Sequence, residues 1–273
     1  MTSAYDGLAH GWDTAAGLVY RPLARSLVAA SPVALAGRLV LDIGSGTGAV
    51  AQAAVARRAR VVAADRSVEM VSYASRRGWP TIAADALALP MRDGVFDAAV
   101  AGFLLNHLPP VPALAELARV VRPGGVVLAS TWAREHTDPV KAAIDSVLAR
   151  CGWIPPAWYQ AMKTQAGNPE RLTAIARQAG LVEVRAWVHR EELGVLDPHA
   201  VVGYRLAMPH IAPWVSNLDA VARAELIGQA LVAVQAHGQG WRPAAILLTA
   251  RLRQQPSLGQ PSQRSASRSN APT

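Results

Sequence analysis

The chain has 273 residues, of which 51% are hydrophobic and 17% are charged, and its formal net charge is +8. This length and balance exclude disordered and fibrous proteins and predict one packed α/β domain, alone or with a cap. The sequence has no run of eighteen apolar residues and lacks the basic start and apolar stretch of a signal peptide. We therefore expect a cytoplasmic protein without a membrane segment.

The cysteine content and the distribution of basic residues indicate which ligands and partners the chain could bind. Cys151 is the single cysteine, so neither an intramolecular disulfide nor a cysteine-based zinc site is predicted, and we expect no metal. Lys141 and Lys163 are the only lysines among 27 basic residues, and the arginines are spread along the chain. A nucleic-acid binder more often has a basic stripe or a recognition motif, so nucleic acid is the less favoured partner. A small-molecule substrate, which could be anionic, is favoured instead.

The first 36 residues precede the first expected strand. They hold an aromatic segment followed by an Ala- and Leu-rich helix from about Pro22, which predicts a helical cap over 1–36. After residue 37, short apolar runs alternate with helix-length segments, which is typical of a parallel sheet with crossover helices on both faces. The expected strands are residues 38–43, 60–64, 97–102, 126–131, 182–188 and 244–252.

Two insertions and a tail complete the expected organisation. Segments at about 134–165 and 191–240 are richer in Trp, Tyr and Pro than the strands and helices around them, so we interpret them as cap insertions within a domain over 37–253. Residues 254–273 are rich in Gln, Ser and Pro and have too few apolar side chains to pack, which predicts a disordered tail.

A glycine-rich loop is the strongest motif. An apolar strand over 39–43 runs into Gly44, Gly46 and Gly48, and a helical stretch follows over 49–57. Glycines let the backbone turn sharply and approach a ligand closely, and the following helix presents free N–H groups. The loop therefore predicts a nucleotide-like ligand.

Three acidic residues help to distinguish possible ligands, because the loop spacing Gly44-x-Gly46-x-x-Ala49 also fits dinucleotides. Asp42 would repel a pyrophosphate but attract the ammonium of a methionine moiety, directly or through water. Asp65 ends the second strand and suits the ribose of either cofactor. Asp85, which follows a short strand, could accept a hydrogen bond from an adenine amino group, and an acid–Ala pair there is unusual for a dehydrogenase.

Taken in order, these motifs resemble a known family. Residues 40–125 are similar to class I S-adenosylmethionine-dependent methyltransferases of the UbiE/type 11 group. The matching features are the loop over 42–48, Asp65, Asp85–Ala86 with Leu89–Pro90, the strand entry Phe96–Asp97, and a helix leading to 122–125. The resemblance implies a Rossmann-like, doubly wound seven-stranded sheet whose last strand is antiparallel, and it covers about a third of the chain strongly.

The same resemblance implies S-adenosyl-L-methionine as the cofactor and assigns residues to it. The glycines 44, 46 and 48 form the donor loop, Asp65 binds the ribose, and Asp85 with Ala86 contacts the adenine. We also expect four further residues at the donor site, namely Asp42, Ser45, Arg66 and Leu105. An isolated aspartate is more often a helix cap or a solvated loop residue, but three in this order outweigh that interpretation.

His107 is the candidate catalytic residue. It follows the fourth expected strand, at the carboxyl edge of the sheet where α/β ligand sites form. Methyl transfer requires a nucleophile held about 3 Å from the methyl carbon in a dry pocket, and a neutral imidazole could deprotonate a phenol, enol or hydroxyl. Cofactor packing and a structural role are the alternatives for His107. Competing imidazoles in the cap and insertions are His10, His136, His199 and His210.

The acceptor is less well defined by the sequence. The insertion aromatics would suit either a flat apolar acceptor or a cap core; they include Trp132, Trp153, Trp158, Tyr159, Tyr204 and Trp214. The Asn/Asp-Pro-Pro-aromatic loop of amino-group methyltransferases is absent after the fourth strand, and Cys151 lies outside the motifs. We therefore expect methyl transfer to O or C of a small organic molecule. The alternatives are a nicotinamide-dependent oxidoreductase, a methyltransferase-fold protein such as a cyclase that binds the donor without methylating, and an RNA modifier.

Overall fold

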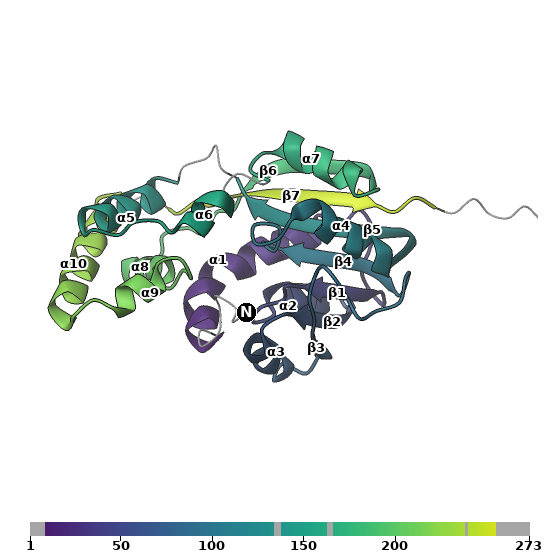
Figure 1. The fold of residues 1–273 in the computed structure, drawn as a ribbon, viewed down its shortest axis with the longest axis horizontal. Helices are drawn as coiled ribbons and strands as arrows, with labels where there is room; N and C mark the ends of the chain where they lie inside the picture. Colours follow the sequence, from purple (N-terminus) through teal and green to yellow (C-terminus); the bar gives the residue numbers. More distant parts are fainter. Residues whose placement is uncertain (1–8, 134–137, 163–165, 238–239, 255–273) are drawn as a thin grey trace, which may run out of the picture.

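A seven-stranded sheet forms the centre of the computed structural model, which describes residues 9–133, 138–162, 166–237 and 240–254 (Figure 1). The strands are β1 (Leu39–Ile43), β2 (Arg60–Asp65), β3 (Thr81–Ala83), β4 (Phe96–Gly102), β5 (Val121–Trp132), β6 (Val182–Arg190) and β7 (Ala244–Arg251). Their order is β3-β2-β1-β4-β5-β7-β6. Neighbours from β3 to β5 are parallel, whereas β7 is antiparallel to both β5 and β6. The expected seven-stranded sheet with an antiparallel last strand is confirmed.

The start of β5 differs from the sequence expectation. The strand begins at Val121 rather than at residue 126, because Val121 pairs with Phe96 before a register shift. Gly124, with φ 74°, lies in this irregular stretch. Residues 122–125, which the sequence places after a helix, therefore form an irregular stretch inside one long strand.

Side-chain alternation along the strands divides the core into two layers. In β1, Val40 belongs to the layer beneath α1 (Ala9–Ala29) and α2 (Ala49–Ala56), and its neighbour Leu41 belongs to the opposite layer. That opposite layer packs beneath α4 (Pro110–Val120) and α7 (Pro169–Gln178). Successive side chains of a strand point to opposite faces, so a nearly continuous apolar strand fills both layers.

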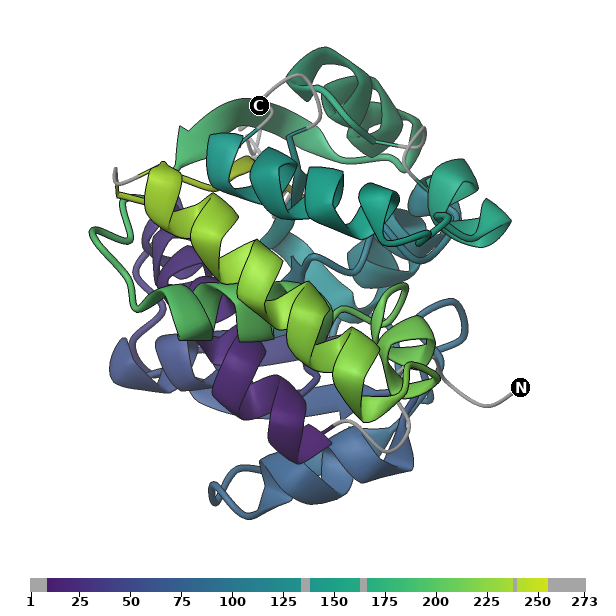
Figure 2. The same cartoon turned by 90° about the vertical axis from the view of Figure 1, so that its left-hand side faces the viewer.

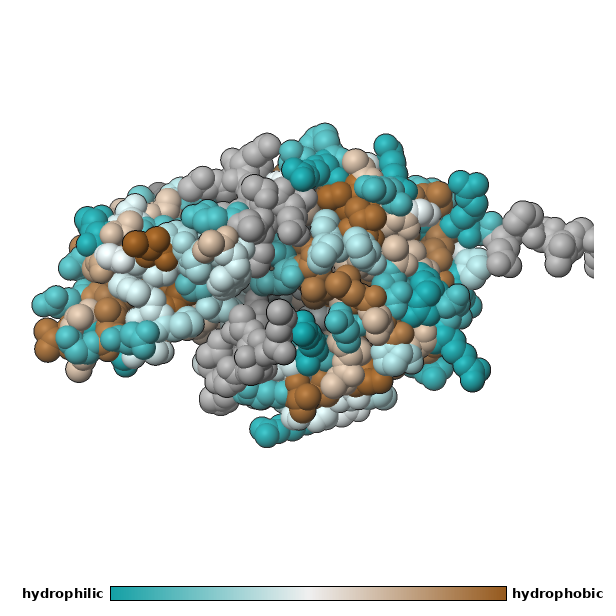
Figure 3. Space-filling view, viewed as in Figure 1, coloured by the Kyte–Doolittle hydropathy of each residue, from teal (hydrophilic) through white to brown (hydrophobic). Residues whose placement is uncertain are grey.

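The remaining helices lie mainly in the expected insertions. They are α3 (Val68–Ser75), α5 (Pro139–Arg150), α6 (Ala157–Met162), α8 (Pro198–Leu206), α9 (Ala212–Ser216) and α10 (Ala220–Ala236). All but α3 gather beyond the end of the sheet where β5 finishes and β7 begins (Figure 1), and α10 crosses the front of this lobe in Figure 2. On the face shown in Figure 3, hydrophobic and hydrophilic residues are interspersed both over these helices and over the part of the molecule that contains the sheet.

The N-terminal helix is longer than the sequence predicts. It begins at Ala9 and continues through Pro22, the position near which the sequence predicts the helix to start. A proline inside a helix removes one backbone hydrogen bond and costs about 3 kcal/mol. Four side chains spaced three or four residues apart are at most 1% exposed and offset that cost by burial: Ala16, Val19, Leu23 and Leu27.

The two ends of the chain lie outside the residues that the structure describes. Of the expected tail over 254–273, all but Gln254 falls outside the described residues, as do residues 1–8 of the cap. Within the parts of the chain that the structure describes, no helix is both long and apolar enough to cross a membrane.

Candidate functional site

A cavity of about 390 Å³ lies along the carboxyl ends of the parallel strands. Its lining runs from Asp85, beyond β3, past Asp65 at the end of β2 and the loop after β1, to Phe103 after β4 and Ser130 on β5. The volume falls within the range of about 300–1,000 Å³ that small-molecule sites occupy, and ligands of α/β sheets bind at this edge.

The glycine loop gives the cavity its floor. Gly44 and Gly46 adopt φ values of +66° and +52°, which few other residues tolerate. A Cβ on Gly44 would lie 2.7 Å from the Leu104 side chain, whereas a Cβ on Gly46 would meet no atom within 4 Å. Gly44 is therefore needed for close packing, and Gly46 leaves open space on the cavity side.

Asp65 holds this loop in position. Its Oδ2 accepts a hydrogen bond from the Gly46 N–H at 2.8 Å, and its Oδ1 accepts one from the Ser67 N–H at 2.9 Å. The Ser45 N–H donates to the Ala64 carbonyl at 3.0 Å. A carboxylate with both oxygens bound to backbone N–H groups has a fixed orientation, so Asp65 borders the cavity in one defined geometry.

Ser45 presents an unsatisfied polar atom at the same place. Ser45 belongs to the cavity lining, the residue is only 8% exposed, and its Oγ is buried. The Oγ has no hydrogen-bond partner among the residues that the structure describes. Because a buried hydroxyl without a partner is costly, this atom marks a position where a polar ligand group or a water would bind.

Asp42 lies behind the loop instead of facing the cavity. It is 1% exposed, and its Oδ2 accepts a hydrogen bond from the Ala51 N–H of α2 at 2.8 Å. Oδ1 has no partner in the described part of the chain. Burial, with a smaller contribution from the charge of Asp65, raises the pKa of Asp42 to about 7 despite the Ala51 hydrogen bond. Asp42 is not among the residues that line the cavity, and its expected contact with the donor, direct or through water, stays a prediction.

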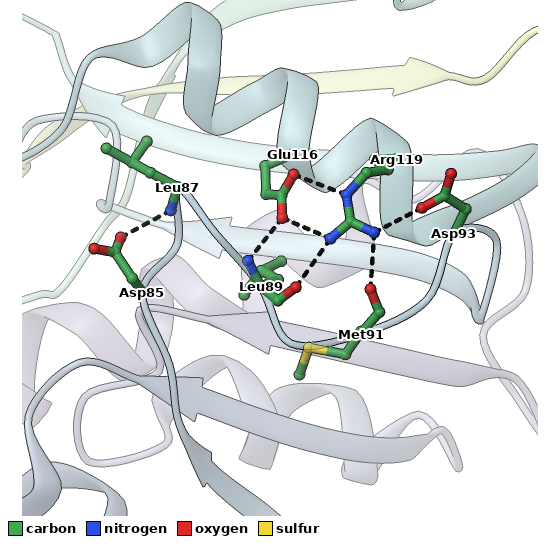
Figure 4. Close-up of polar contacts among 7 residues, drawn as sticks. All are labelled: Asp85, Leu87, Leu89, Met91, Asp93, Glu116 and Arg119. Atoms are coloured by element: carbon green, nitrogen blue, oxygen red, sulfur yellow. Dashed lines mark hydrogen bonds and ion pairs between the residues drawn. The ribbon is translucent and has the colours of Figure 1, made fainter.

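The segment after β3 forms the far end of the cavity, and α4 holds it (Figure 4). Ala86 is buried and lines the cavity, and Asp85 Oδ1 accepts the Leu87 N–H at 2.9 Å. Glu116 accepts the Leu89 N–H at 2.7 Å, and Arg119 donates to the carbonyls of Leu89 and Met91 at 3.0 and 2.8 Å. The Arg119 hydrogen bond lowers the pKa of Glu116, which favours its charged form. Two side chains of one helix thus fix the loop that carries Asp85.

The opposite end of the cavity follows β4. Phe103 has φ +56°, a strained value for a bulky residue, and its N–H donates to the carbonyl and the Oγ of Ser130, both at 3.1 Å. His107 lines the cavity and is exposed as a residue, and desolvation on the protein side of its ring lowers the pKa of the imidazole. The imidazole is therefore neutral at physiological pH.

Helix α1 contributes residues that the sequence analysis did not assign to the site. Trp12, Asp13, Tyr20 and Arg21 line the cavity. Asp13 Oδ2 accepts hydrogen bonds from Arg21 and Arg77, each at 2.8 Å, and from the Tyr73 hydroxyl at 3.1 Å. Burial would raise the pKa of Asp13, but the contacts with Arg21, Arg77 and Tyr73 outweigh it and lower the pKa. The contacts of Asp13 therefore join α1 to Tyr73 of α3 and to Arg77, which follows α3, at one side of the cavity.

The expected site residues divide into two groups. Those that line the cavity are Gly44, Ser45, Gly46, Asp65, Arg66, Asp85, Ala86 and His107. Three do not: Asp42, Gly48, whose Cβ would lie 2.7 Å from Trp79, and Leu105, which is fully buried in the core. Over the described residues, no cluster of His, Cys, Asp and Glu suited to a metal ion occurs.

The competing histidines lie elsewhere or outside the description. His136 and the side chain of His10 are not among the described groups. His210 stacks on Tyr159 with ring centroids 3.7 Å apart, and its Nε2 accepts a hydrogen bond from Arg205 at 3.1 Å. Because neither His210 nor His199 belongs to the cavity lining, His107 is the histidine that the structure brings there.

Solved structures share this fold. A methyltransferase of Haloferax volcanii, in complex with the Trm112 methyltransferase activator, matches with a TM-score of 0.56 and 18% identity over 92% of this chain and 96% of that chain. Phosphoethanolamine N-methyltransferase 2 of Haemonchus contortus, in complex with S-adenosyl-L-methionine, matches with a TM-score of 0.54 and 16% identity over 93% of this chain and 61% of that chain. The [4+2]-cyclase SpnF also matches, with a TM-score of 0.51 and 19% identity over 91% and 96%. Fold alone therefore does not decide the reaction.

Sequence relatives are more specific. A family model described as a methyltransferase domain matches residues 41–129. The demethylmenaquinone methyltransferase of Thermobifida fusca is 32% identical over 166 residues, which cover 58% of this chain and 70% of that protein. The one of Mycobacterium tuberculosis is 31% identical over 195 residues, which cover 68% of this chain and 77% of that protein. That of Corynebacterium urealyticum is 34% identical over 158 residues, 58% of this chain and 64% of its own length, so the match spans slightly less than two thirds of that relative.

The fold and the loop geometry define a class I methyltransferase architecture. With the relatives, they establish that the chain belongs to the UbiE/type 11 family of S-adenosylmethionine-dependent methyltransferases. It is an enzyme of the transferase class whose cofactor is S-adenosyl-L-methionine. The expected family, fold and cofactor are thus confirmed, and the nicotinamide alternative is not supported.

Asp42 should make stability depend on pH. Its folded-state pKa of about 7 lies above the ordinary value of 3.8, so its contribution to stability is complete below about pH 4 and is lost as the pH rises through about 7. Asp42→Asn, which does not titrate, should lack this contribution. In urea unfolding between pH 5 and pH 8, the free energy of unfolding of the wild type should fall relative to the variant, by at most about 1.4 kcal/mol per pH unit. Parallel pH profiles would contradict the assignment.

Arg119 should influence donor affinity without touching the cavity. Arg119→Ala removes the hydrogen bonds that hold the Asp85 loop, so we expect S-adenosylmethionine to bind about three- to tenfold more weakly in calorimetry. Asp93→Ala is the matched control, because the Asp93 side chain is 80% exposed and its ion pair with Arg119 spans 2.7 Å at the surface. Equal affinity in Arg119→Ala and wild type would show that α4 does not position the loop.

Proposed function

We propose that the cavity holds S-adenosylmethionine along the ends of β1, β2 and β3, and that the enzyme methylates O or C of a small organic molecule placed beyond β4. Ser45 and Gly46 would receive the methionine part, Asp65 the ribose hydroxyls, and Asp85 with Ala86 the adenine, with Arg66 beside the ribose. The observation that carries the proposal is the order of these groups along one sheet edge, from the glycine loop to the β3 end.

The residues present fit this donor. The unpartnered Ser45 Oγ needs a polar group, and the space in front of Gly46 accepts one. The fixed carboxylate of Asp65 suits vicinal hydroxyls, which are hydrogen-bond donors. The buried Ala86 offers an apolar surface for a flat base beside the carboxylate of Asp85. Each end of the cavity therefore matches a different part of the same molecule.

The chain's own contribution to methyl transfer would be orientation and exclusion of water. When bound, the donor supplies a methyl group on a positively charged sulfur. Trp12, Tyr20 and Phe103 surround the β4 end of the cavity and would keep it dry. The neutral imidazole of His107 could accept a hydrogen bond or a proton from an acceptor hydroxyl, although its low pKa makes it a weak base. Proximity in a dry site would then supply most of the rate enhancement.

Several features support a small organic acceptor. The relatives from Thermobifida and Mycobacterium are named for methylating demethylmenaquinone. The dispersed arginines favour a small molecule over nucleic acid. The proposal also includes a cytoplasmic location and the division into a cap over 1–36, a methyltransferase domain over 37–253 with cap insertions, and a tail over 254–273.

Asp65 should be the most sensitive donor residue. Asp65→Ala removes the proposed ribose ligand and the hydrogen-bond acceptor of Gly46, so the affinity for S-adenosylmethionine should fall at least tenfold in calorimetric titration. Glu170→Ala, at an exposed carboxylate in the first turn of α7, is the control and should bind like wild type. An unchanged affinity of Asp65→Ala, with the fold intact by circular dichroism, would remove this residue from the donor site.

His107 should remain neutral in mildly acidic solution. Because the pKa of its imidazole is lowered to about 4, its ¹⁵N resonances should show no protonation between pH 8 and pH 5, with His107→Gln used for assignment. The methylation rate should then show no acid limb that belongs to His107 near pH 6.5. A midpoint near 6.5 in the titration would mean that the imidazole is solvated and charged in part at neutral pH.

A further inference from the structure

One helix from beyond the end of the sheet reaches the cavity. Of the described residues that follow Ser130 in the chain, Trp158 of α6 is the only one that lines it. Trp158 is 43% exposed, so it lies where the cavity meets the solvent. In Figure 1, α6 lies between the other helices of this lobe and the sheet. The position of α6 therefore decides how this side of the cavity is closed.

Ring contacts with His210, which follows α8, hold α6 in place. In the part of the chain that the structure describes, α6 packs extensively against no other helix or strand. The ring of Tyr159 stacks on that of His210, with centroids 3.7 Å apart and an interplanar angle of 9°. Trp158 meets the same imidazole edge-on, at 6.4 Å and 81°. His210 therefore contacts two neighbouring residues of α6, one of which lines the cavity.

A buried arginine fixes the His210 ring. The Arg205 side chain, on α8, is only 6% exposed. Its Nε and Nη2 each lie 2.7 Å from Oδ1 of Asp145 on α5, and its Nη1 lies 3.1 Å from Nε2 of His210. A guanidinium has donors only, so Nε2 must be the acceptor and must carry no proton. The contact therefore requires a neutral imidazole in one orientation, with its proton on Nδ1.

Asp145 sets the position of Arg205. Its Oδ1 pairs with Arg205, and its Oδ2 pairs with Lys141 one turn earlier in α5. A buried ion pair adds little net stability over apolar packing, but it restricts the geometry of both partners. The order of contacts is Asp145, Arg205, His210 and Tyr159, which joins α5 and α8 to α6. None of these four residues lines the cavity, so this network acts on the cavity through α6.

We propose that Arg205 and His210 are positioning residues of the cavity, which together hold α6 so that Trp158 closes one side of it. Both residues act through the stack of His210 on Tyr159. A closed site excludes water and slows the exchange of ligands, so the two residues affect ligand residence and KM more than the chemical step. The inference rests on the proposed function in one respect, because it takes this cavity as the place where the methyl donor binds.

The test follows Trp158 directly. In the full-length enzyme labelled with 5-fluorotryptophan, the ¹⁹F resonance of Trp158 is assigned by its absence in Trp158→Phe. Arg205→Lys keeps the positive charge, but one ammonium cannot contact both Asp145 and His210 as the planar guanidinium does. His210→Phe keeps an aromatic ring but removes the acceptor. We expect each substitution to shift or broaden the Trp158 resonance, whereas His199→Phe, at an exposed position of α8, leaves it unchanged.

Ligand exchange gives the functional measurement. The probe is S-adenosylhomocysteine, and its dissociation rate is measured by surface plasmon resonance on the immobilised enzyme. We expect the rate to rise about three- to tenfold in Arg205→Lys and in His210→Phe, and to stay within about twofold of wild type in His199→Phe. Thermal unfolding of each variant shows that it is folded. A general loss of stability does not predict a change confined to one resonance and to ligand release.

The outcomes separate the two proposals. If S-adenosylhomocysteine does not bind to wild type, the proposed donor site fails, whereas the Trp158 resonance still tests the network. If the resonance keeps its wild-type position in either folded variant, Arg205 and His210 do not position α6. If the resonance moves but the dissociation rate does not change, Trp158 does not close the cavity, and the proposal is overturned. Should Arg205→Lys fail to fold, His210→Phe decides alone by the same two measurements.

Discussion

The hydrogen bond between the Asp65 carboxylate and the Gly46 N–H is the contact on which the site depends. It joins the end of β2 to the loop after β1, and the Ser45 N–H reinforces it by donating to the Ala64 carbonyl. The loop position in turn fixes where α2 begins and how Ser45 faces the cavity. One carboxylate thus holds the loop and is also the proposed ribose ligand, so a substitution of Asp65 changes both roles together.

The cap is part of the site rather than an attachment to it. Asp13 accepts hydrogen bonds from Arg77 and Tyr73 beside the proposed donor end of the cavity. The ring of Tyr20 contacts those of Trp132 and Tyr204 toward the β4 end. Residues of α1 from Trp12 to Leu27 therefore line the cavity. Ion pairs of this kind, shared by one carboxylate and partly buried, contribute more to fixed geometry than to net stability. The family fold supplies the sheet edge, whereas α1 and Trp158 of an insertion complete the lining of the cavity.

Local patterns in the sequence predicted the parts of the site that local chemistry determines. The glycine spacing around Gly46, the acid at the end of β2 and the Asp85–Ala86 pair are read within a few residues of one strand. The ring contacts that join Trp12 and Tyr20 to Phe103 depend on α1 packing against β4 and β5, and no pattern near Trp12 or Phe103 predicts them. Leu105 was expected to line the cavity but faces the core, because sequence position alone does not show to which side a loop residue points. The predicted start of α1 at Pro22 was wrong, because burial of the apolar face of the helix outweighs the local cost of a proline within it.

The most direct test of the account is calorimetric titration of the wild-type enzyme with S-adenosylmethionine and, separately, with NADH and NADPH. The structure of the loop and the family of the chain predict saturable, one-site binding of S-adenosylmethionine and none of either nicotinamide cofactor at millimolar concentration. Saturable binding of a nicotinamide cofactor alone would contradict the account, because the loop at Gly44–Gly46 would then accommodate a pyrophosphate in place of a methionine moiety.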